Sequence, residues 1–144
     1  QATVTFSSIS GSYRDLRVVI AAQSSGGASF KLNGDGAANY NFSGFEANGS
    51  TIPGTVQTTT SPAYAAYNIS DFAAGGWGTW TLDFLDYSVT DKHKIALGKT
   101  TVAAAGVTQF NYRWANTAAI TSIALTSAST WSAGSTFALY GVSA

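Results

Sequence analysis

Hydrophobic residues in this chain recur at every second position over short segments, and this period of two limits the fold more than any other feature. Phe30 and Leu32 alternate with Ser29, Lys31 and Asn33, as expected of a strand with one buried face. No stretch of eleven or more residues has the 3.6-residue period of an amphipathic helix. The pattern predicts short strands at residues 3–6, 15–22, 29–33, 65–70, 79–88, 93–100, 108–114, 119–127 and 135–142.

Glycine- and serine-rich segments such as QSSGG, AAGGWG and WSAG separate these strands and are typical of turns. Eight to ten short strands in 144 residues fit one domain, so we expect a single β-sandwich domain over residues 1–144. The fold class is therefore all-β, an antiparallel β-sandwich that is jelly-roll-like. The weakly patterned span at residues 34–62, which holds both prolines, predicts a long loop.

Charged residues make up only 10% of the chain, seven basic against seven acidic. So few balanced charges create no broad field that attracts nucleic acid or an anionic membrane, and we expect neither as a partner. The most apolar run, Leu16 to Ala22, is shorter than the ~20 residues that span a bilayer. Because an isolated subunit usually carries more charge, the composition favours a protein covered by neighbours in an assembly.

The stretch FKLNGDGAANYNF, residues 30–42, has the glycines and the acid of an ion-binding or phosphate-binding loop. A calcium loop requires several oxygen ligands, but Asp35 is followed only by glycine and alanines, and a phosphate loop requires a lysine at the start of a helix. Asn33-Gly34 is instead a strong signal for a tight turn, because both residues tolerate positive φ. The stretch predicts a structural turn.

Enzymatic activity is not favoured by the acidic residues. Asp83 and Asp86 are the best candidates for a glycosidase pair, but positions three apart on a regular strand point to opposite faces unless a bulge intervenes. Glu46, Asp71 and Asp91 remain open as more distant partners. The chain has no cysteine, so thiolate nucleophiles and thiolate metal sites are absent. We therefore expect no catalytic residues, no cofactor and no enzyme activity.

His93 is the only histidine and lies between Lys92 and Lys94. A catalytic base needs an orienting partner and a metal needs further ligands, and the neighbouring sequence supplies neither. The interpretation is an exposed side chain near a turn, with no metal site.

Aromatic residues are numerous for a chain with so few charges. Trp80 shares one strand face with Leu82 and Phe84, which predicts a place in the core. Trp, Tyr and Arg concentrate binding energy at interfaces and aromatic rings stack on sugars. The interface or ligand-binding candidates are Trp77, Trp131, Trp114, Arg113, Tyr64 and Tyr67.

Four segments in order carry a family resemblance: YRDLRVVI (13–20), LNGDGAANY (32–40), RWANTAAITSIAL (113–125) and SAGSTFALYGV (132–142). Together they resemble the ordered signatures of a widespread family of tailed-phage virion proteins and tail-fibre-like domains. The resemblance spans most of the chain. It implies a β-sandwich building block on the virion exterior, often trimeric, with no catalytic residues to carry over.

The chain shows no long fibrous region and no anchoring domain ahead of the sandwich, which favours a small capsid decoration, or cement, protein over a complete tail fibre. Its expected partners are then further copies of itself in a homotrimer and the major capsid protein or other virion proteins. The alternative is a receptor- or glycan-binding domain of a tail fibre or head fibre, whose loop at residues 34–62 contacts a host surface glycan. An enzyme that degrades surface polysaccharide is the least favoured class.

Overall fold

The computed structural model describes residues 1–47, 54–60, 76–102 and 106–144, and all of the regular elements within these ranges are strands. The strands are β1 (Thr3–Phe6), β2 (Asp15–Ala22), β3 (Ala28–Leu32), β4 (Tyr40–Ala47), β5 (Gly54–Thr60), β6 (Gly78–Leu85), β7 (Lys94–Val102), β8 (Gly106–Trp114), β9 (Ile123–Ser127) and β10 (Thr136–Val142).

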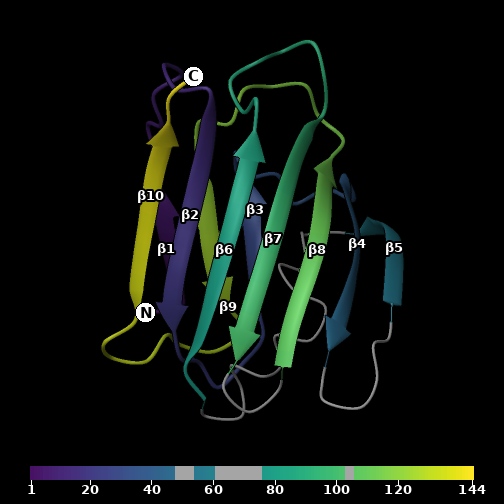
Figure 1. Cartoon of the computed structure of the whole chain (residues 1–144). Coiled ribbons are helices and arrows are strands. Elements are labelled where there is room, and N and C mark those ends of the chain that lie inside the picture. The colour runs from purple at the N-terminus through teal and green to yellow at the C-terminus, as the bar shows by residue number, and fades with distance from the viewer. Residues whose placement is uncertain (48–53, 61–75, 103–105) are drawn as a thin grey trace.

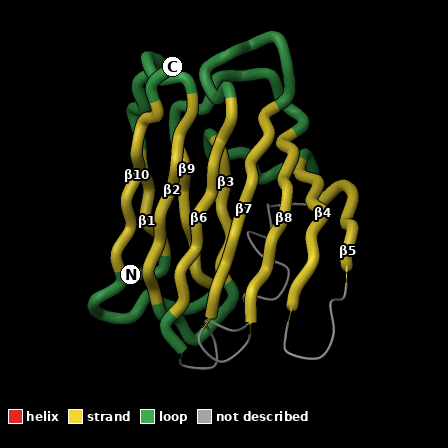
Figure 2. Tube along the Cα trace, viewed as in Figure 1, coloured by secondary structure: helices red, strands yellow, loops and turns green. Residues whose placement is uncertain are grey.

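These strands form two sheets that pack face to face (Figure 1). The larger sheet has seven strands in the order β10-β2-β6-β7-β8-β4-β5, and the smaller has the order β1-β9-β3. Every pairing is antiparallel. The chain crosses between the sheets after β1, β2, β3, β8 and β9, as the trace in Figure 2 shows. The prediction of an antiparallel, jelly-roll-like β-sandwich is confirmed.

The core lies between the sheets because each strand turns its alternate apolar side chains inward. Trp80, Leu82 and Phe84 of β6 are all buried, as their spacing predicts. Phe30 of β3 packs edge-on against Phe84 and Tyr112 of the larger sheet, with ring centroids 5.7 and 5.1 Å apart. Each such aromatic pair contributes about 0.5–1.5 kcal/mol beyond the area it buries, so aromatic contacts join the two sheets.

The prediction of a long loop at residues 34–62 is wrong, because β4 and β5 lie within this span. Tyr40 and Phe42 turn inward from β4 and are buried, but glycine further along the strand obscures the alternation. That glycine has a structural cause, since a Cβ on Gly44 would lie 2.6 Å from the Gln109 carbonyl oxygen of β8. The close approach of two backbones therefore puts glycine inside a strand.

Gly98 of β7 lies beneath an aromatic ring, which leads to a first prediction. A Cβ at this position would lie 1.7 Å from Cε2 of Phe110, so Gly98→Ala forces the ring out of its packed position. We expect the free energy of unfolding to fall by about 2 kcal/mol, because overpacking a core is destabilising. Urea denaturation followed by tryptophan fluorescence measures this change. Gly36→Ala is the control, because its Cβ meets only Lys31 Nζ at 3.9 Å. Equal stability of the two variants would contradict the packing described.

Candidate functional site

The stretch at residues 30–42 is a turn that carries the chain from β3 in the smaller sheet to β4 in the larger. Asn33 and Gly34 have φ values of 51° and 70°, and the Asp35 amide donates to the Leu32 carbonyl at 2.9 Å. Two consecutive residues with positive φ are what the Asn-Gly pair permits. The predicted tight turn is confirmed.

Asp35 uses both carboxylate oxygens within this turn. Oδ2 accepts from Trp114 Nε1 at 2.7 Å and from Asn39 Nδ2 at 2.8 Å, while Oδ1 accepts from the Ala37 amide at 2.9 Å. Burial opposes ionisation of the carboxyl, but these hydrogen bonds outweigh it and lower the pKa of Asp35. The acid therefore holds the turn against β8.

Two pairs among the four segments that carry the phage resemblance are in contact, and the turn itself lies at the end of the sandwich where the C-terminus lies (Figure 1). The Asn33 side chain accepts from the amides of Thr121 and Ser122 at 2.8 and 3.1 Å, which joins the second segment to the third. The Tyr13 ring of the first segment lies against Gly141 of the fourth, where it fills the space of a Cβ. Contacts between distant parts of the chain thus explain these residues of the four segments structurally.

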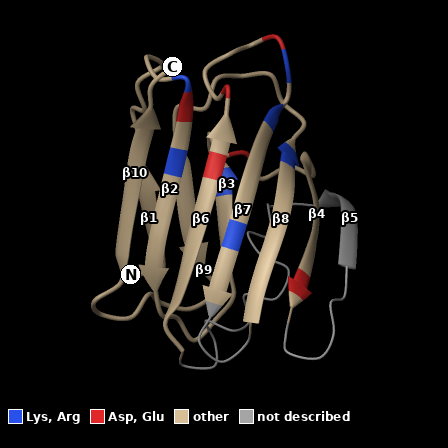
Figure 3. Ribbon diagram, in the orientation of Figure 1, with Lys and Arg blue, Asp and Glu red and all other residues tan. Residues whose placement is uncertain are grey.

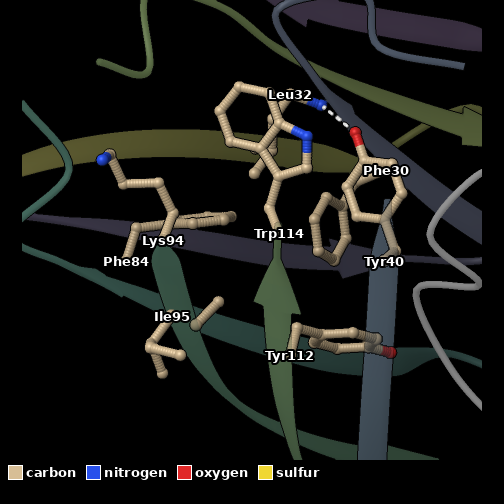
Figure 4. Close-up of a pocket in the computed structure, with 9 residues that line it drawn as sticks. Phe30, Leu32, Tyr40, Phe84, Lys94, Ile95, Tyr112 and Trp114 are labelled. Atoms are coloured by element: carbon tan, nitrogen blue, oxygen red, sulfur yellow. Dashed lines mark hydrogen bonds between the residues drawn. The ribbon is translucent and has the colours of Figure 1, made fainter. Parts of the chain in front are cut away.

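Lys94 lies at the same end and is 1% exposed. Its ammonium group donates to the carbonyls of Val89, Lys92 and Thr117, which matches the three protons of the group. Burial lowers the pKa of Lys94. Figure 4 shows its side chain beside Phe84, at the margin of a group of aromatic core residues, with the ammonium nitrogen directed away from them. The cavity they line has no room for a water molecule, so this region is packed core and not a ligand site.

The two carboxylates considered for a glycosidase lie apart in separate ion pairs. Asp83 accepts from Arg17 Nε and Nη2 at 2.6 and 3.0 Å, and Asp86, in the turn after β6, accepts from Lys92 at 2.7 Å. Asp71 lies outside the described residues. Among the residues that are described, no group of three His, Asp or Glu side chains is placed to hold a metal ion.

His93 is exposed and belongs to a hydrogen-bonded chain. Its Nδ1 accepts from Arg113 Nε at 3.0 Å, and Arg113 Nη1 donates to Asn41 Oδ1 at 3.1 Å. Because guanidinium always donates, His93 Nδ1 is the acceptor. Arg113 is thus held in one orientation at the surface of β8.

The aromatic candidates have different positions. Trp77 is 47% exposed, whereas Trp114 and Trp131 are 3% and 8% exposed. Trp114 and Trp131 therefore belong to the core of the sandwich and are not surface contact residues. Their flanking turns hide this from sequence inspection. Tyr64 and Tyr67 lie outside the described residues. Trp77 and Arg113 remain as exposed candidates.

The solvent-facing side of the seven-stranded sheet, called the outer face below, collects most of the exposed apolar side chains. Figure 3 shows charged residues spread over the same strands. Arg17, Lys99 and Arg113 supply positive charge and Asp83 negative charge. Sequence inspection missed Arg17 and Lys99, although their alternation with buried neighbours signals an outward orientation. The exposed large apolar residues here are Phe45, Leu85, Ile95, Leu97, Val107 and Tyr140.

A depression of about 460 Å³ lies in the middle of the outer face. The Arg17–Asp83 ion pair forms part of its wall, and the hydrogen bond to Asp83 raises the pKa of Arg17. Such a bidentate pair fixes both side chains in one geometry. The lining residues are Arg17, Thr81, Asp83, Leu97, Gly98, Lys99 and Gln109.

A second hollow, the edge groove, lies where β1 and β10 run along the same side of the sandwich (Figure 1). Its volume is about 620 Å³, and its apolar lining includes Phe6, Ile9, Phe137 and Leu139. Within the described residues β1 pairs only with β9, and β10 pairs only with β2. The groove is therefore bordered by two open strand edges.

The described residues include no helix that is long and apolar enough to cross a membrane. No family model matches the chain, and no curated protein matches it. Among solved structures, it is similar to a tetrameric galectin from the ball sponge Cinachyrella sp., with 12% identity and a TM-score of 0.42 over 97% of this chain and 99% of that one. It is also similar to the marine PL-14 alginate lyase from Aplysia kurodai, with 10% identity and a TM-score of 0.32 over 92% and 72% of the chains. Likeness at this level carries no information on function.

Proposed function

We propose that the protein is a non-enzymatic structural protein on the exterior of a bacteriophage virion, and that it decorates the capsid and stabilises the head through subunit contacts. The observation that supports this role is the open side formed by β1 and β10. The ordered resemblance to phage virion proteins and the low charge of the chain point in the same direction.

Open strand edges usually carry protection against pairing with other chains, in the form of charged side chains, proline or a bulge. The sequences TVTF of β1 and TFALYGV of β10 contain no charged residue and no proline. Both strands also keep an unbroken register with their single neighbours. An unprotected edge beside an apolar groove favours a protein whose edge is covered in its working assembly.

Contacts between one side of a subunit and a different side of the next form a ring when the rotation between subunits closes, and an open filament when it does not. The edge at β10 and the opposite edge at β5 lie at the two ends of the larger sheet, and a contact between them with threefold rotation would form the expected homotrimer. The major capsid protein is the alternative occupant of the same edge.

A variant with a lysine on each open edge, Thr5→Lys with Ala138→Lys, tests this function. We expect the wild-type protein to sediment with phage heads stripped of it at a saturable copy number, and the variant to bind roughly tenfold or more weakly, since lysine blocks edge pairing. Circular dichroism and thermal melting check that the variant folds.

Asn111→Lys is the control for an added lysine, with one new charge against two in the edge variant, at an exposed position on β8, which is paired on both sides. Loss of head binding by this control alone would place the contact on the outer face and contradict the edge model. Binding of the wild type to host cells but not to heads, competed by soluble surface polysaccharide, would replace decoration by the receptor-binding alternative.

A further inference from the structure

The outer face presents polar and apolar side chains in one fixed line. Strand register places Arg17 opposite Asp83, Asp83 opposite Leu97, and Leu97 opposite Asn111. With strands about 4.8 Å apart, these four positions span roughly 14 Å. Because β2, β6, β7 and β8 are paired on both sides, the groups are held in place before any ligand arrives, which lowers the entropy cost of binding.

The depression on this line combines the contacts that a sugar ring needs. Its volume of about 460 Å³ lies within the ~300–1,000 Å³ typical of small-ligand sites. Thr81 and Gln109 offer a hydroxyl and an amide, and Leu97, which is 43% exposed, offers an apolar contact for ring C–H groups. The Asp83 oxygens accept from Arg17 and keep further lone pairs for sugar hydroxyls.

The charges around the depression are not balanced. Arg17 and Asp83 compensate each other, whereas no described residue forms a hydrogen bond or ion pair with the Lys99 ammonium group on the neighbouring strand. One uncompensated positive charge matches a single carboxylate. It does not match nucleic acid, whose closely spaced phosphates require a stripe of cations.

We propose that the depression between Arg17, Asp83, Lys99 and Gln109 binds a hexuronic acid unit of an acidic polysaccharide, with the sugar carboxylate on Lys99 and the hydroxyls on Asp83 and Gln109. The site does not depend on the assembly proposed above, which uses the strand edges. It places ligand binding on the strands of the outer face and not in the loops.

Arg113 extends this site along β8. It lies four residues beyond Gln109, which is roughly 14 Å along a strand, and its side chain is held by His93 and Asn41. The guanidinium group carries five protons, so protons remain for a second carboxylate further along the polysaccharide. A longer oligosaccharide is therefore expected to bind more tightly than a single sugar.

Titration of the ¹⁵N-labelled protein with galacturonate and glucuronate oligomers, followed by NMR, tests the site. We expect saturable shifts of the backbone amides of residues 17, 81–83, 97–99 and 109. Lys99→Met and Asp83→Asn are each expected to weaken binding roughly tenfold or more, as loss of a charge-assisted contact does. The methyl ester of the galacturonate oligomer lacks the carboxylate charge. We expect it to bind to the wild type as weakly as the charged oligomer binds to Lys99→Met.

Lys31→Met is the matched control, since it removes the same charge from β3 of the smaller sheet and is expected to bind like the wild type. The proposal is overturned if neither oligomer shifts these amides, if the shifts lie elsewhere, or if Lys99→Met binds like Lys31→Met. Loss of head binding by Lys99→Met, without any oligosaccharide binding by the wild type, would identify the outer face as a protein contact instead. The edge variant Thr5→Lys with Ala138→Lys leaves the depression unchanged. Its binding to heads therefore tests the decoration role independently of the oligosaccharide site.

Discussion

Lys94→Met is expected to lower the free energy of unfolding by about 4 kcal/mol. The ammonium group donates to the carbonyls of Val89, Lys92 and Thr117, and methionine fills a similar volume without any donor. Each carbonyl left unsatisfied in the interior costs about 1–3 kcal/mol, part of which water recovers where the loops open. Urea denaturation followed by tryptophan fluorescence measures the loss.

Lys92→Met controls for the change in net charge. Lys92 is exposed and pairs with Asp86 at the surface, where ion pairs contribute little, so we expect almost no change in stability. Equal stability of Lys94→Met and Lys92→Met would contradict this role. It would show that the buried ammonium group does not hold the loop after β6 against the loop after β8.

Most strands were predictable from the sequence because their faces differ sharply in polarity. β2 alternates Leu16, Val18 and Ile20 on the buried face with Arg17 and Val19 outward, and its bounds agree with the prediction. β4 was missed because Gly44 and polar residues break its pattern, and the cause of that glycine is the neighbouring strand β8. A contact with another part of the chain can thus require a residue that interrupts the local period, and the sequence alone does not reveal the cause.

The candidate sites were less predictable for the same reason. Arg17 and Asp83 lie 66 residues apart in the chain and meet only through the pairing of β2 with β6, so their ion pair has no signature in the sequence. Trp114 and Trp131 stand beside turns and were candidates for exposure, yet their rings lie inward from the strand end and from an isolated bridge. Sequence inspection identifies residue types that bind, whereas strand register decides which of them meet.

The antiparallel sandwich also separates two groups of polar residues in space. The turn at Asn33, the Asp35 carboxylate and the buried Lys94 all lie at one end of the sandwich and satisfy backbone groups there. The outer face and the edge groove contain the side chains whose polar or apolar surface is left uncovered. Mutations at the first set should change stability, and mutations at the second should change binding with little effect on stability.

Asp35→Ala provides the sharpest test of the first set and is expected to cost about 3 kcal/mol at pH 7. The substitution removes three hydrogen bonds and leaves the indole N–H of Trp114 without its acceptor, on a residue that is 3% exposed. Asp91→Ala removes the same charge from an exposed position and should leave stability almost unchanged.

The same variant has a defined dependence on pH. Because the pKa of Asp35 is lowered from 3.8, the unfolded chain binds more protons than the folded one just below that value, so the stabilisation is complete above about pH 5 and is lost as the pH falls through the folded pKa. The difference in unfolding free energy between the wild type and Asp35→Ala should therefore shrink between pH 5 and pH 2. Asp15, whose pKa is also lowered, is present in both proteins and cancels in the difference. A gap that stays constant down to pH 2, or that is absent at pH 7, would show that the turn does not depend on the ionised carboxylate.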